Sequence, residues 1–132
     1  MPKLKNISFR GYISSRQING NKIPQSLQNL KIRDYANLKN IDFKLSVTEY
    51  RMKKSFFALN SLKKEISKLN GIIFFSIYQL PEEKVLRKEI LNFFIQKRKK
   101  IFFALEDIEL KDLNDMQEIE NIFFISKNSK KI

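Results

Sequence analysis

Polar residues that could bind or transform a ligand follow the four most apolar segments of this chain. Serines and an arginine follow the first segment, and a second polar group follows each of the others. In chain order they are Ser14, Ser15, Arg16, Glu49, Tyr50, Arg51, Ser76, Tyr78, Gln79 and Glu106. If the apolar segments are parallel strands, the carboxyl ends of the strands bring these side chains together, and such sheets bind ligands there.

Glu49 and Glu106 are the candidate catalytic residues, because a carboxyl group at a strand end can serve as a general acid or base. Arg16, Arg33 and Arg51 are candidate anion-binding residues, because a planar guanidinium can hold a phosphate or carboxylate with two hydrogen bonds. The chain has only six arginines beside twenty lysines, so lysine-rich codon usage does not explain them. Structural roles are the alternative: glutamates that cap helices and arginines that pair with them.

The absence of cysteine and histidine excludes several classes of activity. The chain has no disulfide, thiolate nucleophile, Ser-His-Asp triad or histidine-ligated zinc. Acid–base chemistry must use Glu, Asp, Tyr, Lys or a bound cofactor, and the sequence identifies neither a cofactor nor a metal site. Ser15-Arg16-Gln17 does not match the glycine-rich phosphate loop of dinucleotide-binding folds.

The net charge of +12, from 26 basic and 14 acidic residues, is compatible with a polyanionic partner. Lysine, isoleucine and asparagine are all abundant, however, which favours AT-rich codon usage and a generally basic surface. The first residues lack the apolar core of a signal peptide, and no apolar segment reaches the length of a membrane span. We therefore predict a soluble cytoplasmic protein without membrane insertion.

The hydrophobic periodicity predicts alternating strands and helices. Strands are expected at residues 7–13, 41–47, 72–77 and 101–105, and helices at residues 24–39, 56–69, 81–99 and 112–124. Because helices separate the apolar strands, we predict a three-layer α/β fold with a four- to five-stranded, mainly parallel sheet of flavodoxin-like topology. The whole chain, 1–132, forms one domain in this prediction, with flexible basic tails at residues 1–6 and 126–132.

Several side chains are expected on particular faces of these elements. Leu27, Leu30, Tyr35 and Leu38 form the predicted inner stripe of the first helix, and Gln25, Gln28, Asn29 and Arg33 lie on another face. Gly71 is expected to end the second helix with a positive φ angle. Phe123 and Phe124 cannot both point inward, so one of them is expected to cover a partner subunit in a homo-oligomer.

Five segments of the chain resemble the sporadic carbohydrate cluster proteins, a family of small bacterial proteins from surface-carbohydrate gene clusters. The segments are RGYISSR at 10–16, PQSLQN at 24–29, IRDY at 32–35, TEYRM at 48–52 and GIIFFSIYQLP at 71–81. The resemblance implies the context of surface-carbohydrate biosynthesis, and together with the polar residues at the strand ends it leads us to expect an anionic sugar or nucleotide-sugar as ligand. Arg16 and Arg33 would then hold its anionic group, Glu49 or Glu106 would act as acid or base, and Tyr50, Tyr78 and Gln79 would orient sugar hydroxyls.

A second resemblance, to the catalytic domain of serine recombinases, concerns the fold. It rests on the G-Y-x-S sequence, the glutamine-rich helix start and the central strand that runs into x-x-L-P. The family has an arginine, one residue and then the nucleophilic serine after strand 1, whereas this chain has Ser14 and Arg16. It has Asp-Arg-Leu-x-Arg after the central strand, where this chain has Tyr78-Gln79-Leu80-Pro81-Glu82. A resolvase-like topology is implied without recombinase activity.

Two functions therefore remain open. The chain is either a protein that binds or processes an anionic sugar, or a non-catalytic resolvase-like module that binds DNA or a partner enzyme. The carbohydrate resemblance favours the sugar over nucleic acid, and the sequence does not establish whether the protein is an enzyme.

Overall fold

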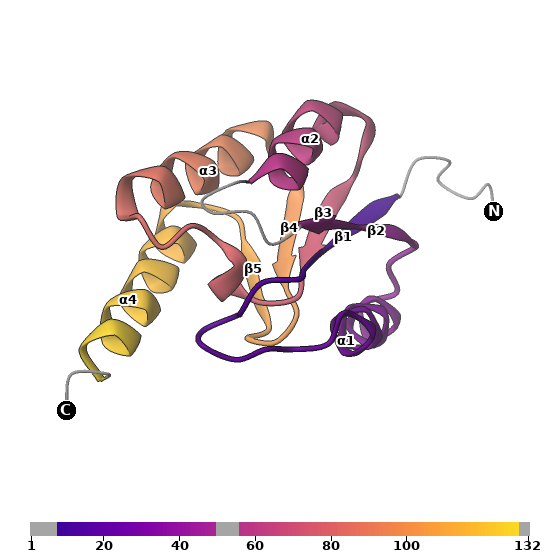
Figure 1. Ribbon diagram of the computed structural model, residues 1–132. Coiled ribbons are helices and arrows are strands. Elements are labelled where there is room, and N and C mark those ends of the chain that lie inside the picture. Colours follow the sequence, from indigo (N-terminus) through magenta and orange to yellow (C-terminus); the bar gives the residue numbers. More distant parts are fainter. Residues whose placement is uncertain (1–7, 50–55, 130–132) are drawn as a thin grey trace.

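The computed structural model describes residues 8–49 and 56–129 (Figure 1). The predicted site residues Tyr50 and Arg51, and the predicted tail at residues 1–6, lie outside these ranges. The elements in chain order are β1 (Phe9–Ser14), α1 (Gln25–Leu38), β2 (Phe43–Glu49), α2 (Phe57–Glu65), the 3-10 helix η1 (Ile66–Lys68), β3 (Gly71–Phe74), the 3-10 helix η2 (Ile77–Gln79), α3 (Lys84–Lys97), β4 (Lys100–Phe103), β5 (Ile108–Leu110) and α4 (Leu113–Ser129).

The strands form one sheet in the order β2-β1-β3-β4-β5, which confirms the predicted α/β class. The first four strands are parallel, and β5 runs antiparallel to β4. The sequence analysis missed β5, because it has only three residues and follows β4 after a tight turn with Asp107 at φ 54°. From β1 the chain connects to β2 on one side, and from β2 it crosses back past β1 to β3 on the other side. The topological switch point therefore lies between β1 and β3.

Helices cover both faces of the sheet, which gives the three predicted layers. Figure 1 shows α1 alone on one side, and α2, α3 and α4 on the other. On the α1 side, Ile32, Tyr35 and Ala36 pack with Ile73 and Phe102. On the opposite side the core is larger and includes the following buried side chains: Tyr12, Leu59, Leu62, Phe74, Leu91, Phe94, Phe103 and Ile119. In the described part of the chain, no helix is long and apolar enough to cross a bilayer.

The inner face of α1 differs from the predicted one. Leu27, Leu30 and Leu38 are 50%, 63% and 73% exposed, whereas Gln28, which was expected on another face, is fully buried. Of the predicted stripe only Tyr35 is buried. From hydrophobicity alone we expected the leucines to face the sheet. Instead Gln28 faces the sheet, where its amide bonds to the backbone of Ser14, and the leucines face solvent.

Several predicted boundaries were also wrong. β2 starts at Phe43 and continues to Glu49, and α3 starts at Lys84, because η2 and an irregular segment follow β3. α4 continues to Ser129, through part of the predicted tail at 126–132. The amide of Asn128 donates to the Phe124 carbonyl at 3.0 Å within this last turn. Phe124 is 68% exposed while Phe123 packs on the core, as the sequence led us to expect.

Gly71 has a different role from the predicted helix cap. It is the first residue of β3 and does not adopt a positive φ angle. A Cβ atom at this position would collide with the backbone carbonyl of Lys100, its partner on β4, and with the Phe9 ring. The requirement for glycine is therefore steric, because the neighbouring strand is too close for any side chain.

We expect Gly71→Ala to lower the free energy of unfolding by about 2–3 kcal/mol, because the backbone of β4 cannot move aside without breaking the sheet. Gly11→Ala is the matched control on β1. Its Cβ would meet the Ser46 hydroxyl and the Phe43 ring, which are side chains that can turn away, at a cost of about 1 kcal/mol. Urea denaturation measures the free energy of unfolding of both variants. Equal losses would contradict the steric explanation.

Candidate functional site

A cavity of about 500 Å³ opens at the switch point, beyond the carboxyl ends of β1 and β3. Residues 14 and 16–18, which end β1 and follow it, form one side of the cavity. Residues 78–83 form another side, and Phe56 and Leu86 lie at the rim. The lining residues are Ser14, Arg16, Gln17, Ile18, Phe56, Tyr78, Gln79, Leu80, Pro81, Glu82, Glu83 and Leu86. Of the predicted site residues, Ser14, Arg16, Tyr78 and Gln79 line this cavity.

A buried hydrogen-bond network underlies the cavity. The Gln28 amide on α1 accepts from the Ser14 backbone N–H at 2.8 Å and donates to the Ser14 carbonyl at 2.7 Å and the Ile23 carbonyl at 2.9 Å. The Gln79 amide donates to the Ser14 hydroxyl at 3.0 Å and accepts from the Ser76 N–H at 3.2 Å. Since all four side chains of the network (Ser14, Gln28, Ser76, Gln79) are buried, it fixes both strand ends against each other.

Glu106 extends this network from the far side. One carboxylate oxygen accepts from the Ser76 hydroxyl at 2.6 Å, and the other accepts from the Ile77 N–H at 2.9 Å. Glu106 therefore stabilises the start of η2, whose N–H groups lack partners within the element. It does not line the cavity. This position agrees with the structural alternative considered for Glu106 from the sequence.

Glu49 occupies the corresponding position at the start of α2. Its Oε2 atom accepts from the N–H groups of Ala58 at 2.6 Å and Leu59 at 3.2 Å, so the carboxylate caps the positive end of the helix. The side chain is 1% exposed, and its Oε1 atom accepts no hydrogen bond from the described residues. The nearest cation recorded is Arg16, whose Nη2 atom lies 4.0 Å from Oε1. Glu49 is likewise not among the cavity-lining residues.

Arg16 links this carboxylate to the cavity. Its guanidinium lies over the Phe56 ring, with Cζ 4.3 Å from the ring centroid, and Nη2 lies 3.5 Å from the Tyr12 hydroxyl. The side chain remains 22% exposed and forms part of the cavity lining. Stacking on an aromatic ring restricts the orientation of the guanidinium plane. Arg16 thus lies between the Glu49 carboxylate at the end of β2 and the cavity.

Burial shifts the acid–base equilibria of this region. Desolvation raises the pKa of both Glu49 and Glu106 above the ordinary value, and the hydrogen bonds that each carboxylate accepts oppose the shift. Desolvation also raises the pKa of Tyr12, with a further increase from the nearby Glu49 charge. In the described residues there is no group of three or more acidic side chains arranged to hold a metal ion.

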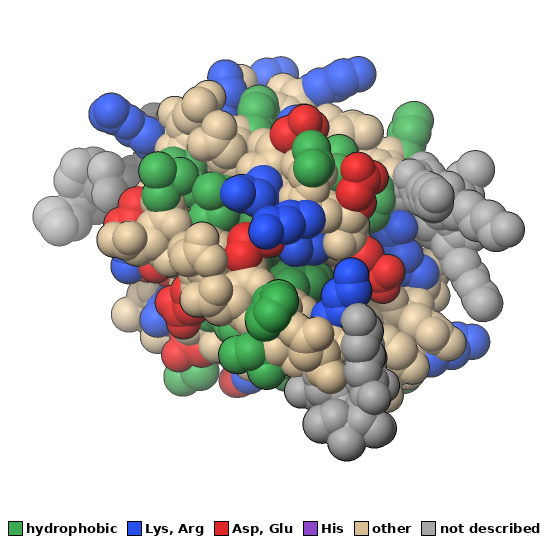
Figure 2. Space-filling view, turned by 90° about the vertical axis from the view of Figure 1, so that its left-hand side faces the viewer, with side chains coloured by type: hydrophobic (Ala, Val, Ile, Leu, Met, Phe, Trp, Pro, Cys, Tyr) green, Lys and Arg blue, Asp and Glu red, His purple; other side chains and the backbone are tan. Residues whose placement is uncertain are grey.

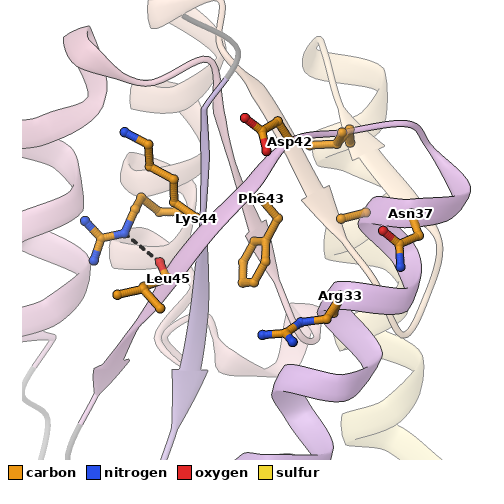
Figure 3. Close-up of a pocket in the computed structure, with 9 residues that line it drawn as sticks. Arg33, Asn37, Asp42, Phe43, Lys44 and Leu45 are labelled. Atoms are coloured by element: carbon orange, nitrogen blue, oxygen red, sulfur yellow. Dashed lines mark hydrogen bonds between the residues drawn. The ribbon is translucent and has the colours of Figure 1, made fainter.

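Besides Glu49, Glu106 and Ser76, two more predicted site residues do not line this cavity. Ser15 donates from its hydroxyl to the Glu49 backbone carbonyl at 3.3 Å and so joins β1 to β2. Arg33 lies on α1 beside another cavity, of about 570 Å³, along the start of β2 (Figure 3). Figure 3 shows Arg33 near Phe43 on one side of β2, and Lys44 and Leu45 on the other. The structure thus places Arg33 apart from the strand-end cavity, because α1 runs away from the strand ends and carries residue 33 with it.

The sequence analysis did not assign Gln28, Phe56 or Arg87 to the site. Gln28 belongs to the glutamine-rich first turn of α1, and its proximity to Ser14 could not be read from helical periodicity. Phe56 contacts Arg16 at the cavity, and Arg87 bonds from α3 to the segment that forms one side of it. Each acts through a contact between elements that are distant in sequence, for which one sequence contains no local signal.

Comparisons with known proteins do not assign the chain to a family. No protein-family model matches the sequence. No curated protein matches it with significant similarity.

The raised pKa of Glu106 predicts a pH-dependent contribution to stability. The folded protein binds the proton more tightly than the unfolded chain, so this contribution is full below the ordinary pKa and decreases as the pH rises through the folded-state value. The unfolding free energy of the wild type minus that of Glu106→Gln should therefore decrease as the pH rises above about 4.3, the ordinary pKa of glutamate. The absence of histidine removes the group that usually titrates there.

Chemical denaturation at several pH values measures this difference. Glu118→Gln, at an exposed position on α4, controls for the loss of one negative charge. A difference that stays constant or increases with pH would contradict the effect of burial at Glu106.

Proposed function

We propose that this protein binds an anionic sugar or nucleotide-sugar in the strand-end cavity, in the context of bacterial surface-carbohydrate biosynthesis. The observation that carries the proposal is the partly exposed Arg16 guanidinium, stacked on Phe56 at a cavity that also contains Tyr78. A phosphate or carboxylate is the natural partner of the guanidinium edge. Aromatic faces are suited to the apolar faces of a sugar or to a nucleobase. The resemblance to carbohydrate cluster proteins supplies the biological context.

The polar lining supports a hydroxyl-rich ligand beyond the anionic group. The Ser14 hydroxyl accepts from Gln79, and because this side chain is fully buried it supports the cavity from beneath. Glu82 and Glu83 lie on the opposite side of the cavity, in the segment after η2, and could accept hydrogen bonds from sugar hydroxyls. Gln79 already uses its amide within the buried network, and its contribution would be to orient Ser14.

The residues that line the cavity support ligand binding more directly than catalysis. Glu49 and Glu106 would be the acid and base, yet both already cap helices and neither lines the cavity. Glu49 could influence a reaction through Arg16, which stands between it and the cavity. We therefore propose a ligand-binding protein first, with an enzymatic role for these two carboxylates as its extension.

Arg16→Lys should weaken binding of UDP-glucose and of glucuronate at least tenfold, because lysine cannot form the bidentate contact. Arg33→Lys is the matched control: it makes the same change on α1, beside the other cavity, and should leave affinity unchanged. Calorimetric titration measures both, with uncharged glucose as the negative ligand control. Absence of heat from every anionic sugar would exclude the proposal, and equal losses in the two variants would exclude Arg16 as the contact.

A second candidate function, binding of DNA, is favoured by a basic edge at the opposite end of the sheet. We define this basic edge as Lys63, Lys64, Lys68, Lys97, Arg98, Lys99 and Lys100. Lys63 and Lys97 both lie over the Phe93 ring, with Nζ 4.8 Å and 5.5 Å from its centroid, which brings the ends of α2 and α3 together. Lys100 pairs with Gly71, close to the end of η1. Cations at helix ends also suit the helix dipole, so we rank this function second.

If the basic edge binds DNA, the affinity should fall steeply with salt, and the triple variant Lys97→Gln/Lys99→Gln/Lys100→Gln should flatten the log–log slope by roughly 2–3, at about 0.9 per phosphate contact. Fluorescence anisotropy of a labelled duplex measures the slope. The triple variant Lys84→Gln/Lys88→Gln/Lys111→Gln removes the same charge elsewhere and should lower the slope less. No binding in dilute salt would exclude this candidate.

A further inference from the structure

Arg87 on α3 and Glu120 on α4 form a buried ion pair behind the cavity. The Arg87 Nε and Nη2 atoms each donate to a different oxygen of Glu120, both at 2.7 Å. The two side chains are only 5% and 6% exposed. The guanidinium also lies over the Phe123 ring of α4, with Cζ 3.9 Å from the centroid. Two hydrogen bonds and a stacked ring together hold Arg87 in one orientation.

The remaining terminal nitrogen of Arg87 binds the wall of the cavity, which we define as residues 78–83. Nη1 donates to the carbonyl of Pro81 at 3.1 Å and to the carbonyl of Glu82 at 2.8 Å. Residues 80–83 belong to no helix or strand, because η2 ends at Gln79 and α3 starts at Lys84. The guanidinium thus supplies hydrogen bonds that a regular element would otherwise provide.

Phe123 holds the other end of the same wall. Its ring centroid lies 5.2 Å from that of Tyr78, which lines the cavity. α4 therefore contacts the wall directly at Tyr78, through an aromatic pair, and supports residues 81–82 indirectly by holding Arg87 of α3. Neither Arg87 nor Glu120 nor Phe123 lines the cavity itself, so any effect of these residues on a ligand must act through the wall.

We propose that α4 sets the shape of the ligand cavity, with Arg87, Glu120 and Phe123 as positioning residues. The effect on ligand affinity rests on the proposed function, whereas the anchoring of the wall does not. A buried ion pair often contributes no more stability than well-packed apolar residues of similar volume. Apolar residues could not replace the two hydrogen bonds that Arg87 donates to the carbonyls of Pro81 and Glu82. The pair therefore determines where the wall lies more than how stable the domain is.

The double variant Arg87→Met/Glu120→Leu tests this proposal, because it replaces both charges together and leaves neither buried alone. Hydrogen exchange followed by mass spectrometry should show the amides of residues 78–86 exchanging at least tenfold faster, with α1 unchanged in the same sample. UDP-glucose affinity should fall at least tenfold. Lys88→Met/Glu118→Leu makes the same chemical change at exposed positions of the same two helices and should alter neither measurement.

Phe123→Leu provides a second test that keeps the ion pair. It should accelerate exchange near Tyr78 more than at residues 84–86. Unchanged exchange of the wall in both variants would overturn the proposal, as would equal acceleration in α1, which would indicate general destabilisation. If the wild type binds no anionic sugar but exchange of the wall still accelerates, the proposed function fails and the anchoring by α4 stands.

Discussion

The buried amide network between Ser14, Gln28 and Gln79 is the constraint on which the site depends. The ends of β1 and β3 diverge at the switch point, and their backbone groups would be buried without partners there. Two glutamine side chains supply these partners, one from α1 and one from η2. An unsatisfied buried polar group costs about 1–3 kcal/mol, so this arrangement admits few alternatives. The cavity lies directly on this rigid support, and a ligand there would meet a preformed surface.

The same electrostatic arrangement, a glutamate at the start of a helical segment, occurs at two strand ends. Glu49 and Glu106 each follow a strand closely and each accepts hydrogen bonds from the N–H groups that begin a helical segment. The negative charge of Glu49 is thus directed toward a helix N-terminus and Arg16, away from the cavity. Arg16 is partly exposed and lines the cavity, which places a cation where an anionic group could bind. Elsewhere charge is mixed: on the face shown in Figure 2, acidic and basic side chains are interspersed.

Different contacts hold the two sides of the proposed site in place. The end of β1 is held by the amide network, while the opposite wall is held from behind by α3 and α4 through Arg87, Glu120 and Phe123. A ligand between these two sides would contact parts of the chain that are far apart in sequence. The basic edge lies at the other end of the sheet, so sugar binding and any binding of DNA would use separate surfaces. Each of the two proposed functions can thus be tested without disturbing the other.

The sequence by itself determined the fold class, the parallel order of the apolar strands and the gathering of Ser14, Arg16, Tyr78 and Gln79 at one end of the sheet. These features follow from hydrophobic periodicity and from the direction of parallel strands, both of which are local or topological properties. Only the tertiary structure decided that Gln28 faces inward while Leu27 and Leu30 face solvent, that Arg33 lies elsewhere, and that Glu49 and Glu106 cap helices. It also revealed β5 and the Arg87–Glu120 pair. These outcomes depend on which buried polar groups find partners across the fold, and hydrophobic pattern carries no information about such long-range pairing.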